Sequence, residues 1–174
     1  MERREQIEIR RMIRKDLDEV LTIEKMSFPA PWSRFLFEQE FLFPHAHLLS
    51  ASDPAFPSRV WGYLCFWLVA EETHILNLAV HPEWRCRGVG SRLLEYVVDF
   101  SRAKGAEEIF LEVRRSNHRA ISVYRRFHFQ ALGIRPRYYQ DSGEDAIIMG
   151  LRLTDPSSTV TNENRPQGNQ RENC

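Results

Sequence analysis

Residues 76–92, LNLAVHPEWRCRGVGSR, decide the fold of this chain because three kinds of backbone follow one another within them. A short apolar strand comes first, an Arg-x-x-Gly-x-Gly loop follows at residues 85–90, and an amphipathic helix then begins. Glycines let a loop backbone approach a ligand, and the unpaired N–H groups of a first helical turn point toward it. Three arginines add positive charge around this loop: Arg85, Arg87 and Arg92. The segment therefore predicts a site for an anionic, phosphorylated cofactor.

The loop differs from two common phosphate-binding motifs. No Gly-Lys-Ser/Thr closes it, so it lacks the lysine and the magnesium-binding hydroxyl of a P-loop. A dinucleotide fingerprint would require Gly-x-Gly-x-x-Gly and an acidic residue about 20 positions later. Because a glycine pair can also simply begin an ordinary helix, the nature of the cofactor has to be inferred from other parts of the chain.

Length and composition describe one ordinary globular domain. The 174 residues are 43% hydrophobic and 28% charged, with a formal net charge of zero. Nothing therefore indicates bulk binding to nucleic acid or to an anionic membrane. No apolar run reaches the length of about 18–20 residues that a membrane helix needs, and the charged N-terminus is unlike a signal peptide. Three cysteines without metal-binding spacing are expected to be free thiols in a reducing cytoplasm: Cys65, Cys86 and Cys174.

Hydrophobic periodicity predicts elements in the order β-α-α-β-β-β-α-β-α-β-β, an α/β fold around a mixed sheet. Strands are expected near residues 7–9, 47–50, 60–69, 73–80, 109–113, 130–137 and 146–153, and helices near 16–25, 34–41, 91–104 and 117–127. Ser33 is the expected N-cap of the second helix, and Gly105 the end of the third. We expect one domain over residues 1–154. The polar tail, 155–174, has too few apolar side chains to offset its ordering entropy and should be disordered.

Three polar residues in the second half of the chain are candidates for chemistry. Glu112 stands inside the apolar strand 109–113, where a carboxylate needs an explanation because buried charges are rare unless paired. It either pairs with an arginine or faces water, or it acts as a general base. Tyr124 lies in the predicted helix 117–127, as a core ring or as a proton donor. Asn117 either caps that helix or contacts a ligand through its amide.

Taken together, the motifs of the chain resemble the GNAT acetyltransferase superfamily, and within it the RimI group of ribosomal-protein N-terminal acetyltransferases. The resemblance extends over about residues 7–152, in order and without a large insertion. It rests on five motifs: FPAPWS (28–33), RCRGVG (85–90), LEVRRSN (111–117), AISVY (120–124), and YY (138–139) followed by EDAIIM (144–149). It implies a GNAT-type fold with a mostly antiparallel central sheet flanked by helices.

The resemblance also implies a role for each matching residue. Three strand residues would pair with the pantetheine chain of acetyl-CoA through their backbone: Leu78, Ala79 and Val80. The pyrophosphate would lie on the loop at the helix N-terminus: Cys86, Arg87, Gly88, Val89, Gly90 and Ser91. Asn117 would add a cofactor contact. Glu112 would be the general base and Tyr124 the acid that protonates the departing CoA thiolate, with no metal involved.

Three residues depart from the family pattern or raise other chemistry. His128 stands where relatives usually have a glycine before the phenylalanine, and a left-handed backbone there would cost about 1–2 kcal/mol without glycine. His118 occupies a position that is often small in relatives, and we expect an exposed histidine at a helix start rather than a second base. Cys86 has no base partner in its motif. We therefore expect direct transfer without an acyl-enzyme intermediate.

The expected acceptor is the α-amine of a protein N-terminus. An α-amine with a pKa near 7.8 is about 14% neutral at pH 7, whereas a lysine near 10.4 is only about 0.04% neutral. A single carboxylate base therefore suits an α-amine better. The same chemistry on a lysine or a small-molecule amine is an alternative, as is a non-catalytic acetyl-CoA-binding module.

The resemblance implies that aromatic segments line the acceptor groove, although these segments could instead be loops packed against the core. The residues concerned are Pro31, Trp32, Tyr138 and Tyr139. For the RimI group the implied substrate is the eighteenth protein of the small ribosomal subunit, modified at its N-terminal residue. The expected location is the cytoplasm, with no nucleic acid or membrane as partner.

Overall fold

The computed structural model describes residues 6–153, which form seven strands and four α-helices. The strands are β1 (Glu8–Arg11), β2 (Ala46–Ser52), β3 (Gly62–Val69), β4 (Glu72–Val80), β5 (Glu108–Arg114), β6 (Gln130–Tyr139) and β7 (Glu144–Arg152). The helices are α1 (Leu17–Ser27), α2 (Arg34–Glu40), α3 (Val89–Ala103) and α4 (His118–Arg126), with short 3-10 turns at Arg14–Asp16 and Pro82–Trp84. This confirms the predicted order of elements. The expectation for the tail, 155–174, lies outside the described residues.

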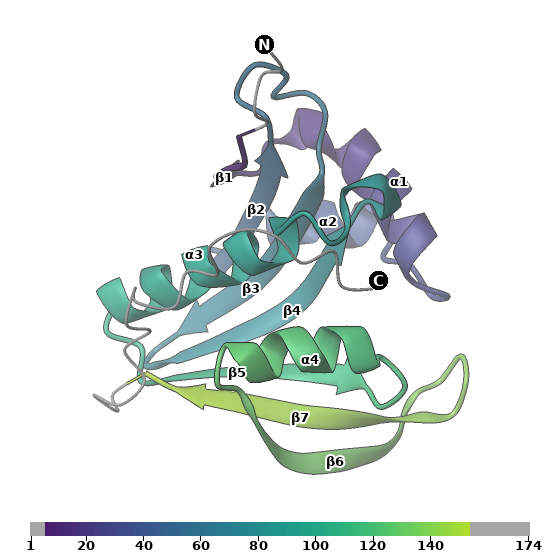
Figure 1. Ribbon diagram of the computed structural model, residues 1–174, viewed down its shortest axis with the longest axis vertical. Coiled ribbons are helices and arrows are strands. Elements are labelled where there is room, and N and C mark those ends of the chain that lie inside the picture. Colours follow the sequence, from purple (N-terminus) through teal and green to yellow (C-terminus); the bar gives the residue numbers. More distant parts are fainter. Residues whose placement is uncertain (1–5, 154–174) are drawn as a thin grey trace.

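The described strands form one sheet in the order β1-β2-β3-β4-β5-β7-β6 (Figure 1). Neighbouring strands are antiparallel except β4 and β5, which run parallel because α3 carries the chain back along the sheet between them. The sheet is therefore mixed and mostly antiparallel, as expected. Strand β5 lies inside it, between β4 and β7, as its apolar sequence predicts.

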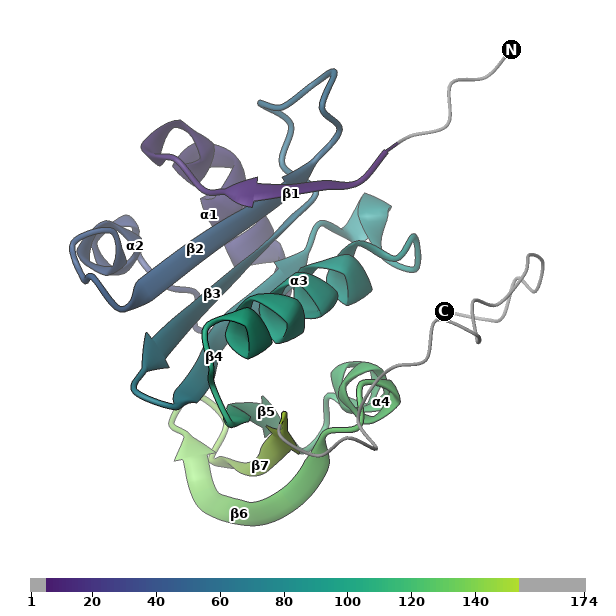
Figure 2. The same ribbon diagram turned by 90° about the vertical axis from the view of Figure 1, so that its left-hand side faces the viewer.

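Helices cover both faces of the sheet, α1 and α2 on one face and α3 and α4 on the other (Figure 2). Helix α3 shows how the sequence achieves this, because its buried residues recur at helical spacing: Val89, Leu93, Leu94, Val97, Val98 and Ser101. Two apolar clusters result, one between the sheet and α3 and α4, the other between the sheet and α1 and α2.

Strand β4 contains one extra residue, and this residue shapes the middle of the sheet. The pairing with β3 shifts by one position between Cys65 and Phe66, so that Leu76 bulges out of the ladder. A bulge bends its strand and interrupts the pairing. The parallel pairing of β4 with β5 ends at Ile75, next to the bulge, and residues 76–80 run apart from β5 (Figure 1).

Local backbone geometry confirms three further predictions. The Ser33 hydroxyl accepts a hydrogen bond from the Leu36 N–H at 3.3 Å and so caps α2. Gly105 follows α3 with a φ of 78°. His128 has a φ of 67°, so the left-handed residue that relatives usually supply as glycine is here a histidine. The left-handed backbone costs about 1–2 kcal/mol at a residue other than glycine, and the fold tolerates this cost at the turn that buries Phe129.

Candidate active site

The divergence of β4 from β5 opens the sheet beside the strand predicted to bind the cofactor. Leu78, Ala79 and Val80 lie in the diverging part of β4 and pair with β3 on their other side. Because β5 does not pair with this part of β4, the backbone N–H and C=O groups on that side can form hydrogen bonds with an extended ligand. The Val80 carbonyl accepts a hydrogen bond from Arg85 Nε at 3.1 Å, which ties the glycine loop to the end of the strand.

The glycine loop leads from β4 to the N-terminus of α3. Gly88 has a φ of 84°, which a side chain would strain. Gly90 is different, because a Cβ there would lie 3.5 Å from Val80 Cγ2, an ordinary contact. The protein itself thus leaves room for a side chain at Gly90, where glycine costs roughly 0.5–1 kcal/mol of helix stability. Together with the first N–H groups of α3, which have no partner within the helix, this space fits an anionic group that approaches the backbone.

The arginines near the loop have partners within the protein. Arg85 Nη2 lies 3.4 Å from Ser27 Oγ at the end of α1. The Arg87 Cζ lies 4.8 Å from the centroid of the Trp84 ring, and Arg92 forms an ion pair on α3. Arginine side chains therefore do lie around the loop, as predicted, and each makes a contact within the protein.

The cysteines follow the prediction only in part. Cys65 is a free thiol, and burial raises its pKa well above the usual value, so it is an inert core residue. Cys86 is disulfide-bonded, so the expectation of a free thiol is wrong at this position. Spacing along a sequence does not report which sulfur atoms a fold brings within bonding distance. Cys174 lies outside the described residues.

Glu112 stands on β5 one residue beyond Leu111, where the pairing with β4 ends. Its Oε1 forms an ion pair with Arg135 Nε at 2.8 Å, and its Oε2 accepts a hydrogen bond from the Tyr138 hydroxyl at 2.7 Å. The arginine pairing considered from the sequence is therefore present. The side chain is nevertheless 29% exposed, so a substrate can reach the carboxylate.

An irregular stretch of β6 brings both partners over Glu112. Residues 135–139 take four steps along the chain while the facing part of β7 takes two. Pro136 offers no N–H to the ladder, and Arg137 has a φ of 52°. The resulting bulge bows β6 (Figure 2) and directs Tyr138 toward β5.

Helix α4 carries His118 and Tyr124, and Asn117 is its N-cap residue. Tyr124 is 7% exposed, with its ring 5.8 Å from that of Phe129 between centroids. Burial raises the pKa of its hydroxyl far above the usual value, so the group keeps its proton at neutral pH. Asn117 Oδ1 accepts the Ala120 N–H at 3.2 Å, so the capping interpretation is confirmed, and its Nδ2 can still donate to a ligand. His118 is exposed at the helix start, as expected.

Glu112 and the Tyr124 helix lie on opposite faces of the sheet. On β5, Leu111 and Val113 point into the same apolar cluster as Tyr124, on the side of α3 and α4. Successive side chains of a strand alternate, so Glu112 points to the other face, toward Arg135 and Tyr138. The Glu112 carboxylate therefore lies on one face of the sheet, and the buried Tyr124 side chain lies on the other.

The aromatic residues predicted to bind the acceptor differ in exposure. Trp32 packs at the edge of the cluster under α1 and α2, with its ring 5.3 Å from Phe37, so the packing interpretation holds for part of this side chain. Tyr138 is 43% exposed. Tyr139 lies under Arg114, whose Cζ is 3.8 Å from the ring centroid, and burial raises its pKa to about 12. Trp32 and Tyr138 lie on the sheet face toward which Glu112 points.

The family model described as the acetyltransferase (GNAT) family matches residues 17–129, a range that includes the opening, the glycine loop, Glu112 and Tyr124. The chain belongs to the GNAT acetyltransferase family. It is an acetyl-CoA-dependent N-acetyltransferase.

Individual relatives of this GNAT acetyltransferase agree in length and fold. A Bacillus subtilis protein, provisionally named a ribosomal protein bS18-alanine N-acetyltransferase, is 38% identical over 84% of this chain and 96% of its own. The crystal structure of the ribosomal-protein-S18-alanine N-acetyltransferase from Escherichia coli superposes with a TM-score of 0.78 at 29% identity, covering 86% of this chain and 96% of that one. The fold is shared with Arabidopsis thaliana NAA60 in complex with acetyl-CoA, at 19% identity and a TM-score of 0.76 over 86% and 100% of the two chains.

Sequence reasoning missed Arg135 as the partner of Glu112, and it missed Glu24, which has contacts in the fold of this GNAT acetyltransferase that its sequence position does not show. Glu24, near the end of α1, is 1% exposed and contacts both the loop of Trp32 and strand β4. A signal for it exists in the sequence, because Glu24 shares i, i+3, i+7 spacing with Leu17 and Val20 on the apolar face of the helix. A charged residue on such a face needs partners, and the fold supplies them.

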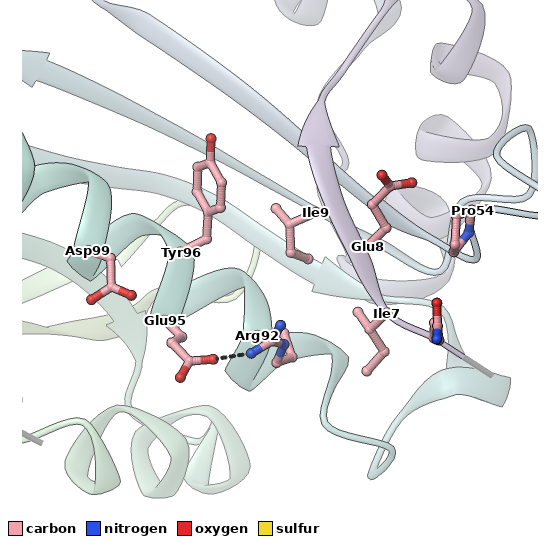
Figure 3. A pocket seen from close by; sticks show the side chains of 9 residues that line it. Ile7, Glu8, Ile9, Pro54, Arg92, Glu95, Tyr96 and Asp99 are labelled. Atoms are coloured by element: carbon pink, nitrogen blue, oxygen red, sulfur yellow. Dashed lines mark hydrogen bonds and ion pairs between the residues drawn. The ribbon is translucent and has the colours of Figure 1, made fainter. Parts of the chain in front are cut away.

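A separate cleft of about 500 Å³ lies between β1 and α3 (Figure 3). Ile7 and Ile9 line it from β1, and the ion pair of Arg92 with Glu95, at 2.7 Å, lines it from α3. Arg92 lines this cleft, but Glu112, Asn117 and Tyr124 do not. Within residues 6–153, no group of His, Cys, Asp or Glu side chains could hold a metal ion, and no helix is long and apolar enough to cross a membrane.

Proposed function

We propose that this GNAT acetyltransferase modifies the N-terminal α-amine of a protein by direct transfer. The observation that supports the proposal is that Glu112 and Tyr124 lie on opposite faces of the sheet, and that Glu112 directly follows the last residue of β5 that pairs with β4. Proton removal from an attacking amine and proton delivery to a departing thiolate are needed at the two ends of one reacting group. This arrangement supplies one group for each.

Acetyl-CoA supplies the acetyl group as a thioester. Glu112 accepts the proton that the acceptor amine loses as its nitrogen bonds to the acetyl carbon, directly or through one water. Arg135 and Tyr138 hold the carboxylate toward the acceptor face during this step. Tyr124, kept protonated by burial, gives its proton to the sulfur as the carbon–sulfur bond breaks.

The residues assigned to the cofactor act mainly through backbone groups. The diverging edge of β4 would pair with the amides of pantetheine: Leu78, Ala79 and Val80. The loop and first turn of α3 would hold the pyrophosphate: Cys86, Arg87, Gly88, Val89, Gly90 and Ser91. The Nδ2 of Asn117 would donate to the cofactor while its Oδ1 caps α4.

On the acceptor side, we propose a protein N-terminus held between Trp32 and the β6 tyrosines Tyr138 and Tyr139. The names of the Bacillus and Escherichia coli relatives specify the alanine of ribosomal protein S18, and we assign the same acceptor to this chain. The single carboxylate base supports an α-amine, since a lysine would need about 3.5 kcal/mol more for its deprotonation. An enzyme with this substrate would act in the cytoplasm, with residues 1–154 as its acetyltransferase domain, and would need neither nucleic acid nor membrane.

The test is acetylation of peptides that carry the N-terminal sequence of ribosomal protein S18, followed by mass spectrometry. The full-length protein and acetyl-CoA are incubated with a peptide whose α-amine is free and with the same peptide blocked at its N-terminus, each containing one lysine. We expect one acetyl group on the free peptide and none on the blocked one. Transfer to lysine in the blocked peptide would refute the N-terminal assignment and favour a lysine acetyltransferase.

A further inference from the structure

Glu24 is a buried carboxylate that the mechanism above does not use. It lies near the C-terminal end of α1 and is 1% exposed. Its oxygens accept hydrogen bonds from three donors on three different segments: the Trp32 N–H at 2.7 Å, the Tyr63 hydroxyl on β3, and Asn77 Nδ2 on β4 at 3.2 Å. The carboxylate therefore joins the α1–α2 connection to two strands of the sheet.

The partners of Glu24 are all neutral. Among residues 6–153 no lysine, arginine or histidine forms an ion pair with it. Burial raises its pKa despite the hydrogen bonds from Trp32 and Asn77. A charge that is costly to bury and has no counter-ion is poorly explained by stability alone.

The contacts of Glu24 lie where the two substrates would meet. The acceptor loop, residues 28–33, has no regular secondary structure, and Pro31 is exposed on it. Asn77 follows directly after the Leu76 bulge, in the part of β4 that diverges from β5. Glu24 is thus the link between the acceptor loop and the cofactor strand.

Aromatic packing connects the side chain of Trp32 to the same carboxylate. The Trp32 ring lies 5.3 Å from that of Phe37, and the Phe37 ring lies 5.6 Å from that of Tyr63, measured between centroids. Tyr63 in turn donates to Glu24. The side chain and the backbone of Trp32 are therefore both fixed with reference to the same carboxylate.

We propose that Glu24 is a positioning residue that fixes the acceptor loop against the diverging part of β4. The inference rests on the proposed function, because it takes residues 28–33 as part of the acceptor site. Binding of the acceptor and binding of acetyl-CoA should depend on Glu24 to different degrees. Strand β4 is held along its length by β3, from Gly62–Val80 to Val69–Glu72, and does not need Glu24, whereas the loop does. Loss of the carboxylate should therefore weaken acceptor binding and leave acetyl-CoA binding unchanged.

The experiment compares steady-state kinetics of Glu24→Leu and Glu24→Gln with wild type, varying the peptide and acetyl-CoA separately. Leucine removes every acceptor, and we expect the KM for the peptide to rise about 10-fold or more, the effect of losing a hydrogen bond to a charged group. Glutamine keeps an oxygen for the Trp32 N–H and should recover most of this loss. The KM for acetyl-CoA should stay within about 2-fold of wild type in both variants.

Glu40 provides a matched control. It is a second nearly buried glutamate, 9% exposed, and it accepts the indole N–H of Trp67 at 2.6 Å, toward the end of β3 remote from Gly62. Glu40→Leu leaves a donor unpaired in the same way but does not touch the acceptor loop. An unchanged peptide KM in folded Glu24→Leu, or an equal rise in Glu40→Leu or in the KM for acetyl-CoA, would overturn the proposal.

Hydrogen exchange gives a test that does not require activity or the leucine variant. The Trp32 amide should exchange several-fold faster in Glu24→Gln than in wild type, because a neutral acceptor binds it less strongly than a carboxylate. Glu40→Gln should leave that rate unchanged. Equal exchange rates of the Trp32 amide in wild type and Glu24→Gln would refute the proposal that Glu24 fixes the acceptor loop. If wild type fails to acetylate any peptide N-terminus, the proposed function fails, and the exchange rates still decide whether Glu24 holds the loop.

Discussion

Two glutamates stand on either side of the proposed acceptor groove and differ in almost every physical respect. Glu112, on β5, is 29% exposed and has a cation, Arg135, as its partner. Glu24, on α1, is 1% exposed and has only neutral donors among its described partners. The first can exchange a proton with a substrate that approaches from solvent. The second has no such access and can act only by keeping its neighbours in place.

The comparison teaches that burial and charge pairing separate chemical from positional roles more clearly than residue type does. A base must meet its substrate, so it requires exposure and partners that can be displaced. A positioning carboxylate requires donors from several segments and exclusion of water. The predictions below test this division, since each variant should affect either turnover or acceptor affinity, but not both.

The largest effect is expected for Glu112→Gln. An amide of the same shape cannot take the amine proton, so kcat should fall on the order of 100-fold or more. Binding of acetyl-CoA, measured by calorimetry, should stay the same, because Glu112 points to the acceptor face. If this variant kept wild-type kcat and instead raised the KM for the peptide, as expected for Glu24→Leu, Glu112 would have a positional role and not a chemical one.

Tyr124→Phe should lower kcat by a similar or smaller factor, on the order of 100-fold. The ring keeps its packing against Phe129, so the melting temperature should change little. A thiol leaving group with a lower pKa needs less proton assistance, so an acetyl donor of this kind should restore part of the rate. Failure of such a donor to reduce the defect would argue against Tyr124 as the acid.

Much of the fold could be predicted from the sequence because local signals agree with it. The Ser33 cap, the left-handed His128 and the apolar face of α3 are each encoded within a few residues. The opening between β4 and β5 is different. It depends on a bulge at Leu76 that appears only when β3 supplies the register, and no local pattern reports that partner.

The candidate site was predictable to the extent that its residues contradict their surroundings. Glu112 interrupts an apolar strand and was therefore noticeable. Glu24 sits in a helix with many charges, where one more acidic residue is ordinary until the fold shows which face is buried. Arg135, the partner of Glu112, comes from β6 and reaches it across β7, a relation that only the sheet order reveals.

A smaller effect is expected for Tyr138→Phe, which removes the hydrogen bond to Glu112 Oε2 and keeps the ring. The carboxylate then keeps its ion pair with Arg135 but loses one of two restraints, so kcat should fall about 3- to 10-fold. The KM for the peptide should change little. Tyr96→Phe, an exposed tyrosine on α3, serves as the control and should behave as wild type. A loss as large as that of Glu112→Gln would indicate that Tyr138 itself takes part in proton transfer.

The smallest effect concerns stability and its dependence on pH at Glu24. Burial raises the pKa of Glu24 in the folded protein above the value of about 4.3 in the unfolded chain. Below that unfolded value both states hold the proton and no penalty exists. As pH rises through the folded pKa, the unfolded chain ionises more easily, so wild type loses stability that Glu24→Gln keeps.

The melting temperature of Glu24→Gln should therefore exceed that of wild type by an amount that grows from pH 4 upward and then levels off. We expect about 2–4 °C, the shift that roughly 1 kcal/mol produces in a chain of this size. Calorimetric scans of both proteins across pH 4–8 measure it. A difference that shrinks as pH rises would mean that the buried carboxylate stabilises the fold, and the contrast with Glu112 would then lose its basis.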